Sequence, residues 1–223
     1  MTVSPHFGVS VLTTAYLPPV EYFFAIAHSD RVLVEQCEAY QKQSWRNRCR
    51  ILSAAGPEDL SIPVVKEERL SRPIRDIRID YSEPWLQHHI RAFAAAYNTS
   101  AFYDYYADDL VPILEEKPVF LFDLNMALLE KLLALLGLNV PLSLTESFVN
   151  DYSSFDGRVR IQPKYKGKSL LAEYGCEQAY YQVFVNRDPS RHSLDRESSF
   201  IPNLSILDLL SAEGPNAGTF LRI

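Results

Sequence analysis

The amino-terminal part of the chain carries one pattern that restricts the fold more than any other. An apolar run at Val9–Leu12 is followed by the turn Tyr16-Leu17-Pro18-Pro19, and a second apolar run follows at Val32-Leu33-Val34. The segment between them places four apolar side chains on one helical face: Tyr22, Phe23, Ile26 and Ala27. Strand, proline turn, short helix and strand predict a right-handed crossover between parallel strands. The turn and the residues after the second strand would then share the sheet edge where open α/β sheets bind ligands.

The rest of the chain divides into a strand-rich, a helical and a mixed part. Short runs rich in branched apolar residues predict further strands at 49–52, 61–65 and 74–80, with a turn at 55–58. Apolar stripes at helical spacing predict helices over 83–97, from about 100, and over 118–136. Pro118 suits the start of the last of these and Gly137 its end.

The last third predicts short elements and one long loop. Strands are expected at 142–148, 159–161 and 179–185, a polar loop at 186–199, and a final helix at 205–211. The predicted fold class is therefore α/β, with a mostly parallel or mixed sheet in the N-terminal part, helices packed on it and a mixed C-terminal segment.

Length, composition and net charge limit the classes of function that are compatible with this chain. The chain has 223 residues, 47% of them hydrophobic, and a formal net charge of −6. We expect a single domain over 1–223 with a full core. The negative charge argues against nucleic acid as a partner, because phosphate binding needs a broad basic surface. The first residues lack the basic and long apolar regions of a signal peptide, and charges interrupt segment 118–136, so we expect a cytoplasmic protein without a membrane span.

Aromatic, basic and amide side chains gather at the turn and after the second predicted strand. The candidate substrate-binding residues are Tyr16, Tyr22, Tyr40, Lys42, Trp45, Asn47 and Arg48. The aromatic members could stack on a sugar or supply hydroxyls to a pocket. The alternative is that they pack in the core with satisfied polar atoms.

The basic members form a local positive patch in an acidic protein. Strand alternation would put Arg46, Arg48 and Arg50 on one side, which suits a phosphate or carboxylate ligand. The alternative is a solvated face whose arginines pair with Glu35 and Glu38.

The cysteines, histidines and glycines of the sequence form no pattern that is typical of a cofactor site or a metal site. The three cysteines, at 37, 49 and 176, fit neither a disulfide framework nor a zinc pattern. Cys37 and Cys49 flank the candidate site, but a nucleophilic cysteine needs a base that the sequence does not show. His88 and His89 are adjacent and cannot form the i, i+4 pair of a helical metal site. No phosphate-binding or dinucleotide-binding glycine loop occurs.

Several short sequence blocks follow one another over nearly the whole chain. They are Ala15-Tyr16-Leu17-Pro18 with Tyr22-Phe23, Tyr40-x-Lys42-x-x-Trp45-x-Asn47-Arg48-x-x-Ile51, Ser61-Ile62-Pro63-Val64, Ile74-x-x-Ile77-x-Ile79 with Trp85, Tyr97 with Ala101-Phe102-Tyr103, Tyr181-Gln182-x-Phe184, and Phe200-x-Pro202-Asn203-Leu204-Ser205-Ile206-Leu207-Asp208-Leu209-Leu210. In this order the blocks resemble the signature of the WbqC-like family, a group of poorly understood bacterial proteins.

The resemblance implies a transferase of surface-polysaccharide (O-antigen) biosynthesis that places glycine or another aminoacyl group on an amino sugar. Lys42, Asn47 and Arg48 would then bind an anionic donor, and the aromatic residues would hold the sugar. Many members carry His-Gln-Pro before the tyrosine, where this chain has Leu12-Thr13-Thr14. The alternative is a non-catalytic protein that binds a small anion or a partner on the same scaffold. A nucleotidyltransferase ranks third, because Pro18-Pro19-Val20-Glu21-Tyr22 lacks the His-x-Gly-His of that class.

Overall fold

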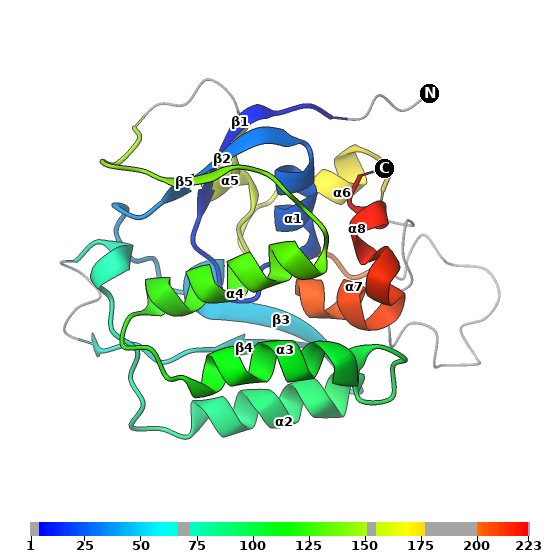
Figure 1. Cartoon of the computed structure of the whole chain (residues 1–223). Helices are drawn as coiled ribbons and strands as arrows, with labels where there is room; N and C mark the ends of the chain where they lie inside the picture. The colour runs from blue at the N-terminus through cyan, green and yellow to red at the C-terminus, as the bar shows by residue number, and fades with distance from the viewer. Residues whose placement is uncertain (1–4, 67–71, 151–154, 177–199, 223) are drawn as a thin grey trace.

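The computed structural model describes residues 5–66, 72–150, 155–176 and 200–222. Its centre is a parallel sheet of four strands in the order β5-β2-β1-β6 (Figure 1). The strands are β1 (Gly8–Thr13), β2 (Ser29–Glu35), β5 (Leu142–Leu144) and β6 (Phe155–Asp156). The predicted α/β fold class is confirmed, although two of the four strands come from the second half of the chain.

The connection between the first two strands is the predicted helical crossover. Helix α1 (Val20–Ala27) begins after Pro19, whose extended backbone (φ −65°, ψ 157°) ends the turn. Phe23 and Ile26 on α1 are fully buried. Strand β2 then returns parallel to β1, with Leu12 opposite Val34. The residues that follow the two strands therefore meet at one edge of the sheet.

A separate antiparallel hairpin follows, formed by β3 (Arg48–Ser53) and β4 (Gly56–Ser61). The strands predicted at 61–65 and 74–80 are wrong. Ser61 is the last residue of β4, and segment 74–76 is the 3-10 helix η3 (Ile74–Asp76). The remaining residues make only the isolated bridges Val64↔Ile79 and Arg78↔Phe120. Pro63 and Pro73 have no backbone N–H to give to a ladder, which explains why apolar content alone does not make strands here.

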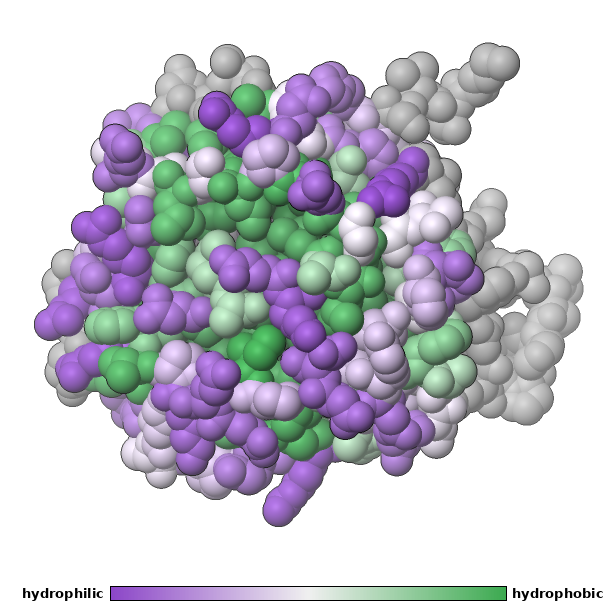
Figure 2. All heavy atoms as spheres, viewed as in Figure 1, coloured by the Kyte–Doolittle hydropathy of each residue, from purple (hydrophilic) through white to green (hydrophobic). Residues whose placement is uncertain are grey.

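The helical middle of the chain is confirmed within a few residues. Its members are α2 (Trp85–Tyr97), α3 (Tyr103–Glu115) and α4 (Leu121–Leu135), and Gly137, with φ +62°, follows the end of α4. In Figure 1, α3 lies above α2, and β3 is seen between α3 and α4. Figure 2, in the same view, shows apolar side chains gathered over β5 and between β5 and α4.

The C-terminal part holds short helices around the sheet and α4. These are α6 (Leu170–Glu173), α7 (Ile206–Glu213), the 3-10 helix η6 (Gly214–Asn216) and α8 (Ala217–Phe220). The predicted final helix is α7, and Ser205 caps it by accepting a hydrogen bond from the Leu207 amide at 3.3 Å. The predicted strand 179–185 and loop 186–199 lie outside the described residues.

The strand predicted at 159–161 is wrong, because this segment is helix α5 (Gly157–Arg160). The Asp156 carboxylate accepts a hydrogen bond from the Arg158 amide at 3.0 Å and caps the turn, which overrides the strand preference of Val159 and Ile161. The strand predicted at 142–148 ends at Leu144.

A connected cluster of buried apolar residues joins these elements, from Leu12 on β1 to Leu221 after α8. Among the described residues, the structure has no helix with the length and apolar character needed to cross a bilayer.

One close contact in this core gives a test of the packing. Helix α8 approaches the end of α4 so closely that a Cβ on Gly218 would lie 2.0 Å from the backbone oxygen of Leu136. We expect Gly218→Ala to lower the free energy of unfolding by about 1–3 kcal/mol, because backbone must move to relieve the overlap. Urea denaturation measures this, with the exposed neighbour Thr219→Ala as the control. A Gly218→Ala protein as stable as the control would show that α8 does not pack this way.

Candidate functional site

The carboxyl edge of the parallel sheet brings together charged side chains that lie far apart in sequence. Strands β1, β2 and β6 end at Thr13, Glu35 and Asp156, and β5 ends one residue before Thr145. In open α/β sheets this edge is where ligands bind. The residues that meet here are called the carboxyl-edge cluster below: Thr13, Glu35, Glu38, Arg46, Thr145, Asp156 and Arg158.

One half of the cluster is a buried ion pair. Arg46, in the 3-10 helix η1 (Trp45–Asn47), donates from Nε to Glu38 Oε1 at 2.9 Å and from Nη2 to Glu38 Oε2. The side chains of Arg46 and Glu38 are 0% and 4% exposed. Thr13 Oγ1 donates a further hydrogen bond to Glu38 Oε1. The end of β1 is thus tied to the segment that follows β2.

The other half is organised around Glu35, whose buried carboxylate accepts four hydrogen bonds. Its Oε1 accepts from the Cys37 amide at 2.8 Å and from Thr145 Oγ1 at 2.7 Å. Its Oε2 accepts from the Val149 amide at 3.0 Å and from Arg158 Nη1 at 3.2 Å. Glu35 therefore fixes the chain that leaves β5 against the end of β2.

Arg158 connects Glu35 to the more accessible carboxylate of Asp156. Its Nε and Nη2 donate to the two oxygens of Asp156 at 3.0 and 2.7 Å. The hydrogen bond to Asp156 raises the pKa of Arg158 against the opposing effect of burial, and the charges of Asp156, Glu35 and Glu38 raise it further. The guanidinium is consequently a permanent cation beside three carboxylates from two segments of the chain, the end of β2 and the end of β6.

Close packing behind Arg158 holds it in this position. A Cβ on Gly157 would lie 2.3 Å from Leu12 Cδ2 on β1, so the absence of a side chain lets α5 approach the strand.

The members of the cluster differ in exposure, and this decides which of them a ligand can reach. The side chains of Glu35 and Arg158 are 0% and 8% exposed, whereas that of Asp156 is 26% exposed. Cys37 is partly buried and its Sγ lies 3.7 Å from Arg75 Nη1. A ligand would thus meet Asp156 first, with Arg158 and Glu35 behind it.

Of the predicted binding residues, the two tyrosines from the turn and α1 are buried with partners. The Tyr16 hydroxyl lies 3.0 Å from Nδ1 of the buried His89 on α2, and the Tyr22 hydroxyl donates to the Thr13 carbonyl at 2.8 Å. Burial raises the pKa of both phenols, and in Tyr22 the charge of Glu38 adds to the effect. Neutral, buried hydroxyls of this kind hold the turn in place.

The predicted aromatic and amide residues after β2 are buried as well. Tyr40 and Trp45 are 9% and 1% exposed, and the Trp45 carbonyl accepts from the Tyr16 amide at 2.8 Å. Asn47 donates from Nδ2 to the Ile62 carbonyl at 2.7 Å. The predicted proximity of the two segments is therefore confirmed, while the side chains of Trp45 and Asn47 support the loops around the edge.

The basic residues separate into two groups rather than one face. Arg46 precedes β3 and is buried with Glu38, one of its two predicted carboxylate partners. Arg48 and Arg50 share a side of β3 and both contact Asp59 of β4, at 3.2 and 2.7 Å. Lys42 lies on an exposed turn. The predicted single row of three arginines is thus wrong for Arg46, because a helical turn interrupts the strand alternation there.

No sequence pattern indicated that Asp156 and Arg158 belong to a site. Both follow a two-residue strand, β6, which is too short to give a periodic signal. In the sequence, Glu35 and Glu38 stand out only as partners for the arginines. Their position directly after the predicted second strand was the one available indication that they belong to the edge itself.

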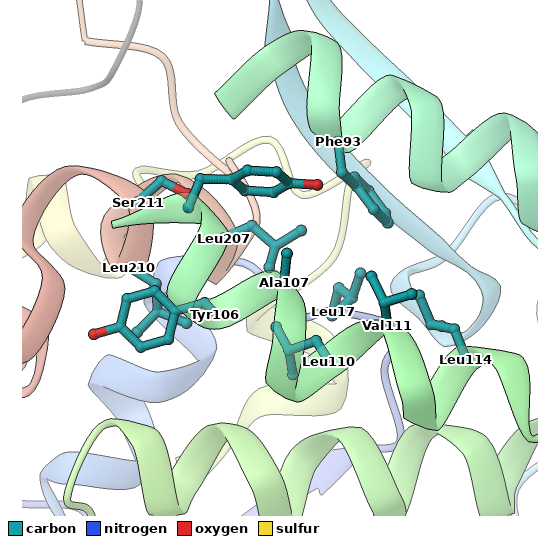
Figure 3. Close-up of a pocket in the computed structure, with 11 residues that line it drawn as sticks. Leu17, Phe93, Tyr106, Ala107, Leu110, Val111, Leu114, Leu207, Leu210 and Ser211 are labelled. Carbon is teal, nitrogen blue, oxygen red and sulfur yellow. The ribbon is translucent and has the colours of Figure 1, made fainter. Parts of the chain in front are cut away.

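Hollows in the described part of the chain include two away from this edge, and none of the seven predicted residues lines either of these two. A cavity of about 20 Å³ sits between α2, α3 and α7, where Phe93, Leu110 and Leu207 contribute to its wall (Figure 3). It has room for at most one water molecule and its lining is almost wholly apolar. A surface hollow of about 240 Å³ lies at the start of α2, between Tyr81, Gln87 and Lys117. The carboxyl edge is therefore the candidate site, because charged groups from distant parts of the chain converge there.

In the described residues, neither the buried cysteine thiols nor the side chains that commonly bind metals form a second candidate site. Burial raises the pKa values of Cys49 and Cys176, which keeps both thiols protonated and inert. Within the described ranges, no group of three or more His, Cys, Asp or Glu residues is arranged to hold a metal ion.

The fold and the edge together define an α/β protein with a polar candidate site at the carboxyl ends of its parallel strands. The chain belongs to the WbqC-like protein family, whose model matches residues 14–220. It is similar to the uncharacterized protein Rv1507c of Mycobacterium tuberculosis (strain ATCC 25618 / H37Rv), with 30% identity over 229 residues, covering 96% of this chain and 97% of that protein. No solved structure matches the chain.

Proposed function

We propose that this protein transfers an aminoacyl group, of which glycine is the simplest, to the amine of an amino sugar in surface-polysaccharide biosynthesis. The observation that carries the proposal is the pair Asp156 and Arg158 at the carboxyl edge, a partly exposed carboxylate beside a buried guanidinium. The family resemblance supports the substrate class, and the excess of carboxylates over guanidiniums in the cluster suits an ammonium group.

The chemistry assigns a role to each of the two residues. Asp156 would hold the ammonium of the sugar and accept its proton, so that the free amine can attack the carbonyl carbon of an activated aminoacyl donor. The new carbon–nitrogen bond forms as the bond to the leaving group breaks. The leaving group departs with the electron pair and takes up the second proton that the nitrogen loses. Arg158 would stabilise the negative charge that develops on the carbonyl oxygen.

The seven predicted binding residues have further roles in this proposal. Lys42 is the exposed cation among the predicted residues and is our candidate for the anionic part of the donor. We further propose that Tyr16, Tyr22, Tyr40, Trp45, Asn47 and Arg48 shape the loops beside the substrate. The protein would act as one domain in the cytoplasm on small molecules, without a bound cofactor, and the net charge of −6 supports the absence of nucleic acid.

A binding experiment tests the ammonium site. We expect glucosamine and galactosamine to bind more tightly than their N-acetyl derivatives, and Asp156→Asn to weaken that binding roughly 10- to 150-fold by removing a charge-assisted contact. Isothermal titration calorimetry measures both effects. The matched control is Asp59→Asn, a similarly exposed carboxylate that pairs with Arg48 and Arg50 on the hairpin. Equal affinity for the amine and N-acetyl sugars would contradict the proposal.

A ligand-binding protein without turnover is the second candidate. The four internal donors to Glu35 favour it, because they leave that carboxylate no capacity for chemistry. Incubation with a glycyl thioester and a bound amino sugar separates the two candidates. An enzyme yields the glycyl amide, detected by mass spectrometry, and loses this product in Asp156→Asn, whereas a binding protein yields none above the uncatalysed rate.

A further inference from the structure

We propose that Phe148 is the platform on which the pyranose ring of the acceptor stacks, an assignment that rests on the proposed function and deepens it. Phe148 belongs to the segment between β5 and β6 and follows Thr145, the member of the cluster that lies on that segment.

The ring of Phe148 is held at the rim of the carboxyl-edge cluster by the cluster itself. The guanidinium carbon of Arg158 lies over the ring, 5.2 Å from its centroid. The residue is nevertheless 47% exposed, so a large part of the ring faces solvent. Arg158 therefore occupies one side of the ring, and the remaining surface is available to a ligand.

The backbone beside Phe148 is fixed by the same charged groups. The Val149 amide donates to Glu35 Oε2 at 3.0 Å, and the Val149 carbonyl accepts from Arg158 Nη1 at 2.7 Å. Two buried charges thus hold the residue that follows Phe148. An exposed aromatic side chain on so firmly held a backbone is typical of a ligand contact, because little ordering entropy is lost on binding.

The neighbouring chemistry indicates a sugar rather than a purely apolar group. A hexosamine ring has one face of C–H groups and an edge of hydroxyl and ammonium groups. The C–H face matches an aromatic surface, and the ammonium matches the carboxylate of Asp156, which contacts the same arginine. Phe148 and Asp156 both contact Arg158, and they would meet the two halves of such a ligand.

Tyr165 gives a matched comparison within the chain. It is also a partly exposed aromatic residue, 37% exposed, and the guanidinium of Arg160 lies 5.2 Å from its ring centroid. Arg160 pairs with Glu173 and not with a member of the cluster. Tyr165 therefore has the same local contact without the neighbouring site.

The test measures the affinities of Phe148→Ala, Phe148→Trp and Tyr165→Ala for methyl glucosaminide and for ethanolamine, an amine with no sugar ring. We expect Phe148→Ala to weaken binding of the glucosaminide about tenfold while its affinity for ethanolamine stays unchanged. Phe148→Trp should retain the glucosaminide affinity, and Tyr165→Ala should match the wild type. Saturation-transfer NMR on the wild type should show the strongest transfer to the ring C–H protons.

The outcomes separate this inference from the proposed function. Glucosaminide binding that depends on Asp156 but is unchanged in Phe148→Ala overturns the stacking role and leaves the proposed function in place. If none of the amino sugars binds, the proposed function is overturned, and the stacking role with it. A loss in Phe148→Ala that is equal for both ligands also overturns the stacking role, because it would reflect a change in the amine site.

Discussion

Replacing Arg46 by methionine should lower the free energy of unfolding by about 3–5 kcal/mol, the largest single effect that we expect on stability. The substitution removes both hydrogen bonds that Arg46 donates to the buried Glu38, whose side chain is only 4% exposed. A carboxylate left there would keep Thr13 as its remaining donor within the cluster. Urea denaturation monitored by tryptophan fluorescence measures the change.

A double variant and a control test whether the unpaired charge of Glu38 causes the loss of stability. Adding Glu38→Gln to Arg46→Met should recover part of the loss, because an amide keeps an acceptor for Thr13 without a buried charge. The control is Arg48→Met, which removes an ion pair whose two side chains are 24% and 28% exposed and should cost less than about 1 kcal/mol. Equal effects of Arg46→Met and Arg48→Met would show that the Glu38–Arg46 pair does not hold the edge together.

Replacing Glu21 by glutamine should stabilise the protein above pH 7, by up to about 3 kcal/mol. Glu21 lies in the first turn of α1 and is 4% exposed, with Oε2 accepting from the Leu170 amide at 3.1 Å. Burial raises its pKa from 4.5 to about 7, against smaller opposing effects of the Leu170 amide and Arg160. The folded protein therefore binds the proton more tightly than the unfolded chain does. This contribution is present below pH 4.5 and is lost as the pH rises through 7.

The contribution of His89 to the free energy of unfolding changes with pH in the opposite direction, over nearly the same pH range. Burial, together with the neighbouring His88, lowers its pKa from 6.5 to about 4, although a hydrogen bond to the Ser61 backbone opposes the shift. Its contribution is complete above pH 6.5 and is lost as the pH falls through 4. Between about pH 4.5 and 6.5, the contributions of Glu21 and His89 change the free energy of unfolding in opposite directions. The two changes should largely cancel in the wild type.

The Glu21→Gln variant should reveal the contribution of His89. We expect its free energy of unfolding to rise between pH 4.5 and 6.5, with little difference from the wild type at pH 4.5. Denaturation series at several pH values measure this, with Glu130→Gln, an exposed carboxyl on α4, as the control. Parallel curves for the wild type and Glu21→Gln from pH 4 to 8 would contradict the assignment of the raised pKa to Glu21.

The candidate site was only partly predictable. The crossover pattern predicted that the turn at Tyr16 and the segment around Trp45 would meet, and the backbone hydrogen bond between these two residues shows that they do. It did not predict which side chains would point inward. Tyr16, Tyr22 and Asn47 are as polar as typical ligand contacts, yet each makes its hydrogen bond within the protein. A residue type does not reveal whether its partner is a ligand or the chain itself.

The sequence alone determined the α/β class, the β1–α1–β2 crossover and the positions of α2, α3 and α4. Each of these depends on local periodicity and on prolines and glycines that act over a few residues. Only the tertiary structure decided the composition of the carboxyl edge. Glu35 and Arg158 are 123 positions apart, and the two-residue strand β6 and the close approach of Gly157 to Leu12 bring them together. No local pattern records such a contact, because its cause is the pairing of β6 with β1 and the burial of charges that compensate each other.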